Sequence, residues 1–263
     1  MPESVARACA ASAIVHPRPF GQHDSADEVT GKPPMLSASI EDYIKAIYTL
    51  ERDSQTATTK RIAQRLGVKM ASVTGMIKHL AAEGYLRHTP YRGVKLSDRG
   101  HDVAVNMIRR HRLIELFLEK TLGLTWDEVD ADAEILEHAV SDHLIERIYE
   151  YLGRPEFDPH GSPIPGKDGS FPPRPGVTLD QLPEGARGRV VEVSDRDPEL
   201  LRYLTRLKLK IGTRIKVCER APFGGPITIK VGSSSVAIGR EAAERIRVSA
   251  EPAKPVRRRA KRS

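Results

Sequence analysis

The chain has few cysteines, no long hydrophobic run and no clear leader segment. Its two cysteines, Cys9 and Cys218, lie far apart, and neither belongs to a pair with metal-ligand spacing. This argues against a disulfide scaffold and a zinc ribbon, and it fits the reducing cytoplasm. No apolar run approaches the roughly 20 residues that cross a bilayer, so no membrane partner is expected. The mildly apolar stretch 8–15 lacks a charged n-region and a clean cleavage site, which argues against a signal peptide.

Charge is distributed unevenly along the 263 residues, whose formal net charge is +7. Residues 36–106 contain 11 basic and 7 acidic side chains, whereas residues 107–152 contain 5 basic and 11 acidic side chains. The end of the chain, residues 254–263, contains six basic residues and no acid. A basic segment followed by an acidic one indicates a polyanion partner for the first and a cation for the second.

Hydrophobic periodicity predicts three helices and a β-hairpin in the basic segment. The first helix begins at Ser39 and carries an apolar stripe at helical spacing: Ile40, Tyr43, Ile44, Ile47 and Tyr48. Asp42 lies on the opposite side from this stripe. The elements expected next are helices at 59–66 and 71–82 and strands at 85–89 and 93–96.

The second and third helices have helix-turn-helix form, and the hairpin adds a wing. The side chains expected to meet DNA are Lys69, Ala71, Ser72, Thr74, Lys78, Arg92 and Lys95. Small residues let the helix backbone approach base edges, while the lysines can meet phosphate or guanine. Gly75 inside the third helix costs about 1 kcal/mol against alanine and either permits close approach to DNA or is merely tolerated. The alternative is a plain helical hairpin with solvated lysines.

The second half of the chain changes from helical to β-type patterning. Ser97 caps a long helix reaching Leu122, and the capping box Thr125-x-x-Glu128 opens another helix that continues to Leu152. Short β-type runs follow at 189–193, 214–218, 228–231 and 235–238, interrupted by a helix at 198–207. The fold class predicted is mainly α with small β parts, ending in a small barrel-like domain.

Metal-capable side chains recur on two consecutive helices. His111 and Glu115 form an i, i+4 pair, and the next helix carries Asp130, Glu134, Glu137 and His138 on one face. Four such groups on one face are costly if buried without a partner, and a divalent cation would relieve their repulsion. The alternative is a solvated acidic face. His143 falls on the opposite side from Glu134 and is interpreted as a surface or interface residue.

At this point the sequence resembles the diphtheria-toxin-repressor family of iron- and manganese-dependent regulators. The matching stretches are 40–48, the helix-turn-helix with 71–74, 109–115, 134–142 and 161–166. The resemblance covers roughly residues 36–248. It implies a homodimer that binds palindromic operator DNA to repress metal-uptake genes, with a winged helix-turn-helix domain, a helical metal-binding and dimerisation domain, and a C-terminal SH3-like β-barrel.

The resemblance also implies a set of metal ligands. Asp42, Glu134, Glu137 and His138 would form one site, with His111, Glu115 and Asp130 at a second or shared site. The iron-specific branch tends to have Met at the position of Asp42 and Cys at that of Glu134, so carboxylates there resemble the manganese-responsive branch. Oxygen and nitrogen ligands without thiolate suit Mn²⁺ or Fe²⁺. An iron-dependent repressor is therefore the alternative.

Two positions depart from the family pattern. The manganese branch often has glutamate where this chain has Lys45, which bears on whether a two-metal cluster forms. Some relatives lend ligands from the SH3-like domain, and here Asp197 or Glu199 are the nearby candidates.

Two other classes of protein remain as alternatives. A metallo-hydrolase is the more distant one, because the chain has no nucleophile elbow, phosphate loop or zincin motif, so no enzyme is expected. A metal-independent winged-helix regulator is the other.

Six segments are expected along the chain: a disordered extension (1–35), the DNA-binding domain (36–106), the helical domain (107–152), a proline- and glycine-rich linker (153–176), the SH3-like domain (177–248) and a basic disordered tail (249–263). An alternative for the extension is that translation starts at Met35, directly before the first helix.

Overall fold

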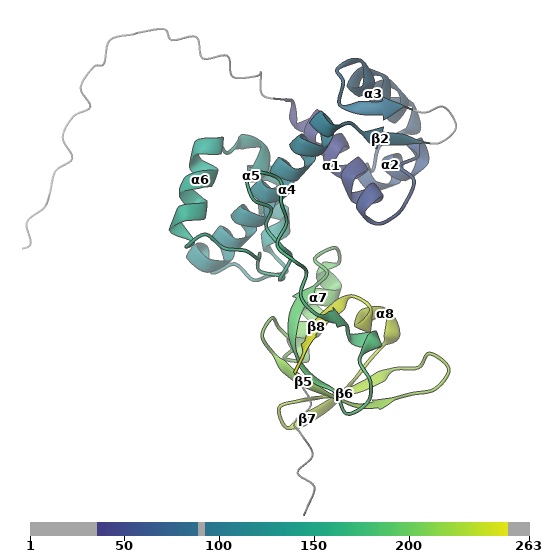
Figure 1. Ribbon diagram of the computed structural model, residues 1–263, viewed down its shortest axis with the longest axis vertical. Coiled ribbons are helices and arrows are strands. Elements are labelled where there is room, and N and C mark those ends of the chain that lie inside the picture. Colours follow the sequence, from purple (N-terminus) through teal and green to yellow (C-terminus); the bar gives the residue numbers. More distant parts are fainter. Residues whose placement is uncertain (1–35, 89–92, 252–263) are drawn as a thin grey trace, which may run out of the picture. The chain divides into compact units, whose positions relative to one another are not determined.

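The computed structural model describes residues 36–88 and 93–251 (Figure 1). The expectations about the extension 1–35, Arg92 and the tail from residue 252 onward lie outside the described residues. Among the residues that are described, no helix is long and apolar enough to cross a membrane. Helices dominate up to residue 151 and strands dominate after it, so the fold class predicted from the sequence is confirmed.

The N-terminal part is a winged helix-turn-helix. Its elements are α1 (Ala38–Arg52), α2 (Thr59–Leu66), α3 (Met70–Ala82), β1 (Leu86–His88) and β2 (Val94–Leu96). The Thr58 side chain caps α2 by accepting from the Arg61 amide, and Gly67 ends it in the left-handed region with φ of 65°. A fully buried core joins the three helices: Ile44, Ile47, Ile62, Val73 and Leu80. The antiparallel strands β1 and β2 form the wing.

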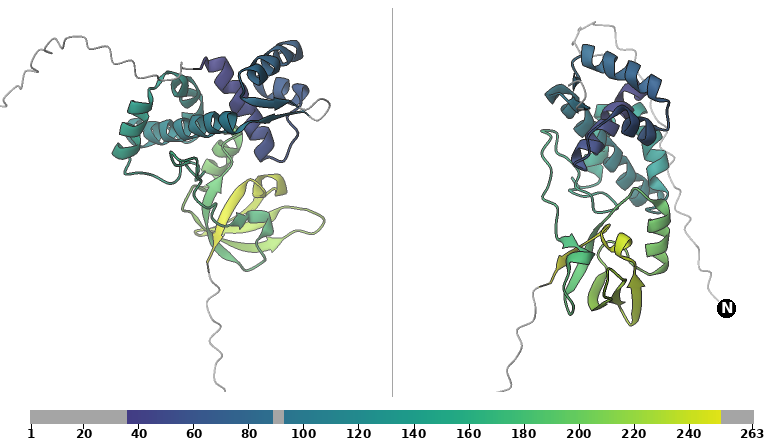
Figure 2. Two further views of the ribbon diagram at one scale, coloured as in Figure 1. Left: turned by 45° about the horizontal axis from the view of Figure 1, so that its top comes forward. Right: turned by 90° about the vertical axis from the view of Figure 1, so that its right-hand side faces the viewer.

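The helical part contains α4 (Asp98–Phe117), which is one long helix in Figure 2 and continues into the π-helical turn η1 (Leu118–Leu122). The sequence predicted a single helix from the capping box to Leu152, and this was wrong. Two helices are present, α5 (Val129–Ala139) and α6 (Asp142–Tyr151). Val140 is extended, and the Ser141 hydroxyl caps α6 by accepting from the Leu144 amide.

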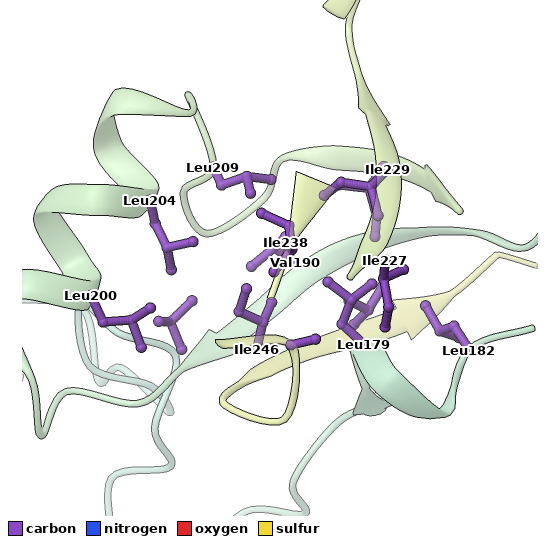
Figure 3. Close-up of a cluster of buried hydrophobic side chains, with 14 of the residues drawn as sticks. Leu179, Leu182, Val190, Leu200, Leu204, Leu209, Ile227, Ile229, Ile238 and Ile246 are labelled. Carbon is purple, nitrogen blue, oxygen red and sulfur yellow. The ribbon is translucent and has the colours of Figure 1, made fainter. Parts of the chain in front are cut away.

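The C-terminal part is a six-stranded sheet in the order β3-β8-β4-β5-β6-β7, in which neighbouring strands are antiparallel. Its elements are β3 (Val177–Thr178), η2 (Leu179–Gln181), β4 (Arg187–Val193), α7 (Pro198–Arg206), β5 (Arg214–Arg220), β6 (Ile227–Val231), β7 (Ser234–Ile238), α8 (Arg240–Ala243) and β8 (Ile246–Ala250). Figure 3 shows Leu200 and Leu204 of α7 directed at the sheet residues Val190 and Ile246. Periodicity did not reveal β3 and β8.

The proline-rich segment between the helical and β parts is packed into the fold over part of its length. Its buried side chains include Asp158, His160, Ser162 and Ile164. Gly161 has φ of 81°, and a Cβ there would lie 1.9 Å from the Val191 carbonyl oxygen. Only glycine fits this close approach, which places the neighbouring His160 against β4, where its carbonyl accepts from the Val193 amide.

Candidate metal centre

Asp42 of α1 meets Glu134 and His138 of α5. Ligand-capable atoms of these three side chains all lie within 4.8 Å of one another, and Asp42 Oδ1 is 3.1 Å from His138 Nε2. Burial raises the pKa of the Asp42 carboxyl above its ordinary value, with Glu134 adding to this and His138 opposing it. We call Asp42, Glu134 and His138 the bridging cluster, because it joins the helix-turn-helix to the helical part.

Glu41, the neighbour of Asp42, orients the histidine of the bridging cluster. Its Oε2 lies 2.7 Å from His138 Nδ1. A carboxylate on one ring nitrogen fixes the tautomer so that the other nitrogen is free to accept a cation. His138 Nε2 is therefore the atom presented to Asp42. The sequence analysis did not select Glu41, although its position directly before Asp42 is the signal that could have done so.

Lys45 lies one turn after Asp42 and directs its ammonium at the acids of α5. Its Nζ is 2.7 Å from Glu134 Oε2, 2.8 and 2.9 Å from the two Glu137 oxygens, and 3.3 Å from His111 Nδ1. Burial alone would lower the pKa of Lys45, but the charges of Glu137 and Glu134 raise it above its ordinary value. His111, Glu134 and Glu137 form a group with metal-ligand geometry, and an ammonium already lies within it.

His111 is buried and contacts acids on both sides of its ring. Nδ1 lies 2.6 Å from Glu137 Oε2, and Nε2 lies 3.4 Å from Glu115 Oε1 and 3.3 Å from Asp130 Oδ1. Burial opposes protonation, yet these carboxylates raise the pKa of His111 well above its ordinary value. All seven ligand candidates predicted from the sequence therefore lie in overlapping groups that link α1, α4 and α5.

The structure adds a group that the sequence analysis missed, formed by Glu115, Asp158 and His160. We call it the buried cluster, because all three side chains are completely enclosed. Neither oxygen of Glu115 has a hydrogen-bond partner, nor does His160 Nδ1. Burial and the charge of Glu115 raise the pKa of Asp158 to about 7. Burial lowers the pKa of His160, but the charges of Glu115 and Asp158 raise it above its ordinary value overall.

The C-terminal domain approaches these groups through a different residue from the two expected. Asp197 caps α7 by accepting from the Glu199 and Leu200 amides, and neither Asp197 nor Glu199 belongs to a metal-capable group among the described residues. The charge of Asp195, by contrast, contributes to the raised pKa values in the buried cluster. Asp195 also helps to line a cavity of about 510 Å³ that includes Asp42 and Lys45.

The donor set fits a divalent cation. Asp42 Oδ1 and both oxygens of Glu115 are buried without hydrogen-bond partners, which is costly for carboxylates in the absence of a positive charge. The ligands are carboxylate oxygens and imidazole nitrogens, without thiolate or thioether. Such ligands suit manganese, iron and related divalent ions at six-coordinate sites.

The candidate DNA contacts are accessible on α3 and β2. Lys69, which precedes α3, is exposed, as are Ala71, Ser72, Thr74 and Lys78 on α3 and Lys95 on β2. The Thr74 hydroxyl donates to the Met70 carbonyl of its own helix at 3.0 Å. A Cβ added at Gly75 would meet nothing within 4 Å, so no contact within the described structure requires glycine there.

Comparison with known families gives three matches in chain order. The iron dependent repressor N-terminal DNA binding domain matches residues 35–94, and the iron dependent repressor metal binding and dimerisation domain matches residues 97–166. The FeoA domain matches residues 177–250.

Individual relatives extend over the same region. The chain is 32% identical over 225 residues to the iron-dependent repressor IdeR of Mycobacterium tuberculosis, covering 81% of this chain and 97% of the relative. A solved manganese-dependent transcriptional repressor in complex with manganese aligns with a TM-score of 0.73 at 41% identity, over 81% of this chain and 100% of that one. ScaR with bound Cd²⁺ aligns with a TM-score of 0.69 at 35% identity, over 80% and 98% of the two chains.

Proposed function

The chain belongs to the family of iron-dependent repressors, and from this premise we propose that its activating ion is Mn²⁺, held by the bridging cluster. Members of this family are metal-dependent transcriptional repressors, and this chain has a DNA-binding domain, a dimerisation domain and an SH3-like FeoA domain. The chain is accordingly a metal-dependent transcriptional regulator and not an enzyme.

The observation that carries the proposal is the pairing of Asp42 with His138 across two helices. Asp42 belongs to the first helix of the DNA-binding domain, and His138 belongs to the dimerisation domain. At 3.1 Å, Asp42 Oδ1 and His138 Nε2 are close enough to share one cation. A single cation could be bound at once by Asp42 of the DNA-binding domain and by Glu134 and His138 of the dimerisation domain. Binding by all three would fix the orientation of α1 on α5.

The oxygen content of the bridging cluster favours Mn²⁺ over Fe²⁺. Asp42 and Glu134 provide carboxylates, which are hard ligands, and hard cations of low intrinsic affinity depend on them most. The resemblance to a solved repressor that binds manganese, at 41% identity, supports the same choice. Fe²⁺ remains the second candidate, because the chain is also similar to an iron-dependent repressor.

Lys45 limits how many ions the domain junction takes. Its ammonium lies among His111, Glu134 and Glu137, where a second cation of a two-metal cluster would bind. A tethered positive charge neutralises the two glutamates without an ion. We therefore assign one exchangeable cation to the bridging cluster and a second to the buried cluster, instead of a two-metal site around Glu137.

Cation binding acts on DNA through the dimer. Apolar side chains remain exposed on α5 and α6, among them Ile135, Leu144 and Tyr151, and these are the proposed dimer contacts. In a dimer, the angle between domains sets the distance between two α3 helices, which must match half-sites about one turn of DNA apart. Fixing that angle selects a DNA-competent conformation, and the expected target is a palindromic operator of metal-uptake genes.

Exposed lysines on α3 provide a separate test of the DNA-binding face. Lys78→Ala should weaken binding about equally across sequences if the ammonium meets phosphate. It should also lower the slope of log affinity against log salt by about one unit. Unchanged affinity and slope for both Lys69→Ala and Lys78→Ala would remove α3 from the interface.

The decisive experiment on the function is a DNA-binding titration with Mn²⁺, Fe²⁺ (anaerobic), Zn²⁺ and a chelator. The proposal predicts binding at the lowest concentration of free Mn²⁺ relative to Fe²⁺ and loss of binding on chelation. A lower requirement for Fe²⁺ would establish the iron-dependent alternative. Binding that survives chelation unchanged would show a regulator that does not need metal.

A further inference from the structure

Trp126 is the single tryptophan of the chain, and it packs in an unexpected place. In the sequence it precedes α5 of the dimerisation domain. Its side chain is nevertheless buried in the hydrophobic core of the C-terminal domain, together with Leu201 and Leu204 of α7. One residue of the helical part therefore completes the core of the β domain.

Trp126 makes two polar contacts, one with the C-terminal domain and one with the buried cluster. Its indole Nε1–H donates to Thr205 Oγ1 of α7 at 2.9 Å, which ties it to the C-terminal domain. Its backbone carbonyl accepts from His160 Nε2 at 2.6 Å, and the two rings stack with centroids 6.1 Å apart and planes 18° from parallel. Trp126 thus touches both the β domain and the histidine of the buried cluster.

The contact with Trp126 decides which nitrogen of His160 is available to a ligand. A carbonyl oxygen only accepts, so Nε2 carries the proton that it donates to Trp126. Nδ1 is the remaining nitrogen, and it faces Glu115 Oε1 at 3.7 Å and Asp158 Oδ1 at 3.9 Å. These separations are too long for hydrogen bonds and leave Nδ1 without a partner.

We propose that Trp126 is a positioning residue that couples cation binding at the buried cluster to the packing of the C-terminal domain. The inference rests on the proposed function, because it takes the buried cluster to bind a divalent cation. Trp126 orients His160 in the way that a carbonyl or carboxylate orients a metal-bound histidine by accepting from its other ring nitrogen. It differs from an ordinary partner of this kind because its own ring is fixed by another domain.

Coupling of this type is reciprocal. If docking of Trp126 against Thr205 strengthens cation binding by some factor, cation binding strengthens that docking by the same factor. The bridging cluster fixes the DNA-binding domain on α5, whereas the buried cluster fixes the FeoA domain. Two ions of the same kind then control two different domain contacts.

Trp126 also supplies the measurement, since its fluorescence reports on the ring stacked against His160. The full-length protein is titrated with Mn²⁺ alone while the Trp126 emission is recorded. Asp42→Asn should retain the emission change, and Glu115→Gln should abolish it. Thr205→Val removes the indole acceptor at an exposed position and should shift the midpoint to about tenfold higher Mn²⁺, the low end of the loss caused by removing a hydrogen-bond partner that orients a metal-bound histidine. Thr205→Ser keeps the hydroxyl and is the matched control.

Each outcome separates the coupling from the underlying function. If Thr205→Val and Thr205→Ser share the parent midpoint while Glu115→Gln abolishes the signal, the cluster binds Mn²⁺ and the coupling is overturned. If Glu115→Gln titrates like the parent, the buried cluster is not the ion site, and the inference fails with it. The bridging cluster is then still tested by DNA binding. Trp126→Phe, followed by calorimetry, gives a second check: a parent-like affinity would also overturn the coupling.

Discussion

The bridging and buried clusters use the same kinds of side chain in opposite surroundings. Glu134 in the bridging cluster is half exposed, and Lys45 already places a positive charge 2.7 Å from it. In the buried cluster every side chain is enclosed, with Arg112 Nε 3.4 Å from Asp158 Oδ2 and His111 Nε2 3.4 Å from Glu115 Oε1. Lys45 compensates the first arrangement at hydrogen-bond distance, whereas both oxygens of Glu115 and Asp158 Oδ2 in the second have no hydrogen-bond partner.

The difference indicates what each ion contributes. An ion at the bridging cluster would join two domains at a place where Lys45 already compensates the acidic charge without an ion. It should therefore act as a switch and have a modest effect on the free energy of unfolding. An ion at the buried cluster relieves the desolvation of Glu115 and Asp158, so it should contribute mainly to stability. The predictions below test this division, beginning with the largest effect.

His138→Ala should abolish Mn²⁺-dependent DNA binding. It removes a nitrogen ligand, so the loss of metal affinity should exceed the roughly 10–100-fold caused by removing a group that only hydrogen-bonds to a ligand. The measurement is anisotropy of a labelled duplex against Mn²⁺. His143→Ala is the control, because this exposed histidine on α6 belongs to no metal-capable group among the described residues. Parent-like binding by His138→Ala would remove the bridging cluster from the mechanism.

Replacing Asp42 with Met and Glu134 with Cys together should change the metal preference. Two hard oxygen ligands become softer sulfur ligands, on which Mn²⁺ depends least. The double variant should lose its Mn²⁺ response and keep more of its Fe²⁺ response, measured anaerobically by DNA binding. The single variants should lie between these extremes, and their effects need not add, because both residues would share one coordination sphere. A double variant that responds to Mn²⁺ like the parent contradicts the assignment of both ligands.

Lys45→Gln should increase the number of bound ions by one per chain. Without the ammonium, Glu134 and Glu137 regain an uncompensated charge that a cation can satisfy. Native mass spectrometry or calorimetry with Mn²⁺ measures the stoichiometry. Lys60→Gln, at an exposed position of α2, should leave it unchanged. An unchanged count for Lys45→Gln would show that the ammonium does not take the place of an ion.

The smallest expected effect is a pH dependence of stability in the cation-free protein. The pKa of Asp158 is about 7 in the folded state and near 3.8 when unfolded, so the folded state binds more protons between these values. Stability should therefore be highest below pH 4 on this account and fall as pH rises to 7. This loss of stability should appear as a lower melting temperature at pH 7 than at pH 5. Asp158→Asn should flatten this dependence, and a parent-like slope would contradict it.

Much of the bridging cluster could be predicted from the sequence because its ligands obey local rules. Asp42 departs from an apolar stripe, and Glu134 and His138 recur at helical spacing, so each was visible within one helix. The break between α5 and α6 was missed because Ser141 caps a helix inside a continuous periodic pattern. Tertiary packing decided that boundary.

The buried cluster could not be predicted either, because tertiary packing brings its members together. Asp158 and His160 lie in a segment whose prolines and glycines indicate a linker, and nothing in their spacing points to Glu115. Their meeting depends on Gly161, whose missing side chain allows close approach to Val191. Lys45 was recognised as a departure, but that its ammonium reaches Glu137 follows only from the packing of α1 against α4 and α5.

The most direct test of the division between the clusters is anomalous diffraction from crystals grown with Mn²⁺. The account predicts one peak within bonding distance of Asp42, Glu134 and His138, and a second among Glu115, Asp158 and His160. No peak is expected where the Lys45 ammonium lies between Glu134 and Glu137. A strong peak at that place, with Lys45 displaced, or the absence of a peak at the bridging cluster, would contradict it.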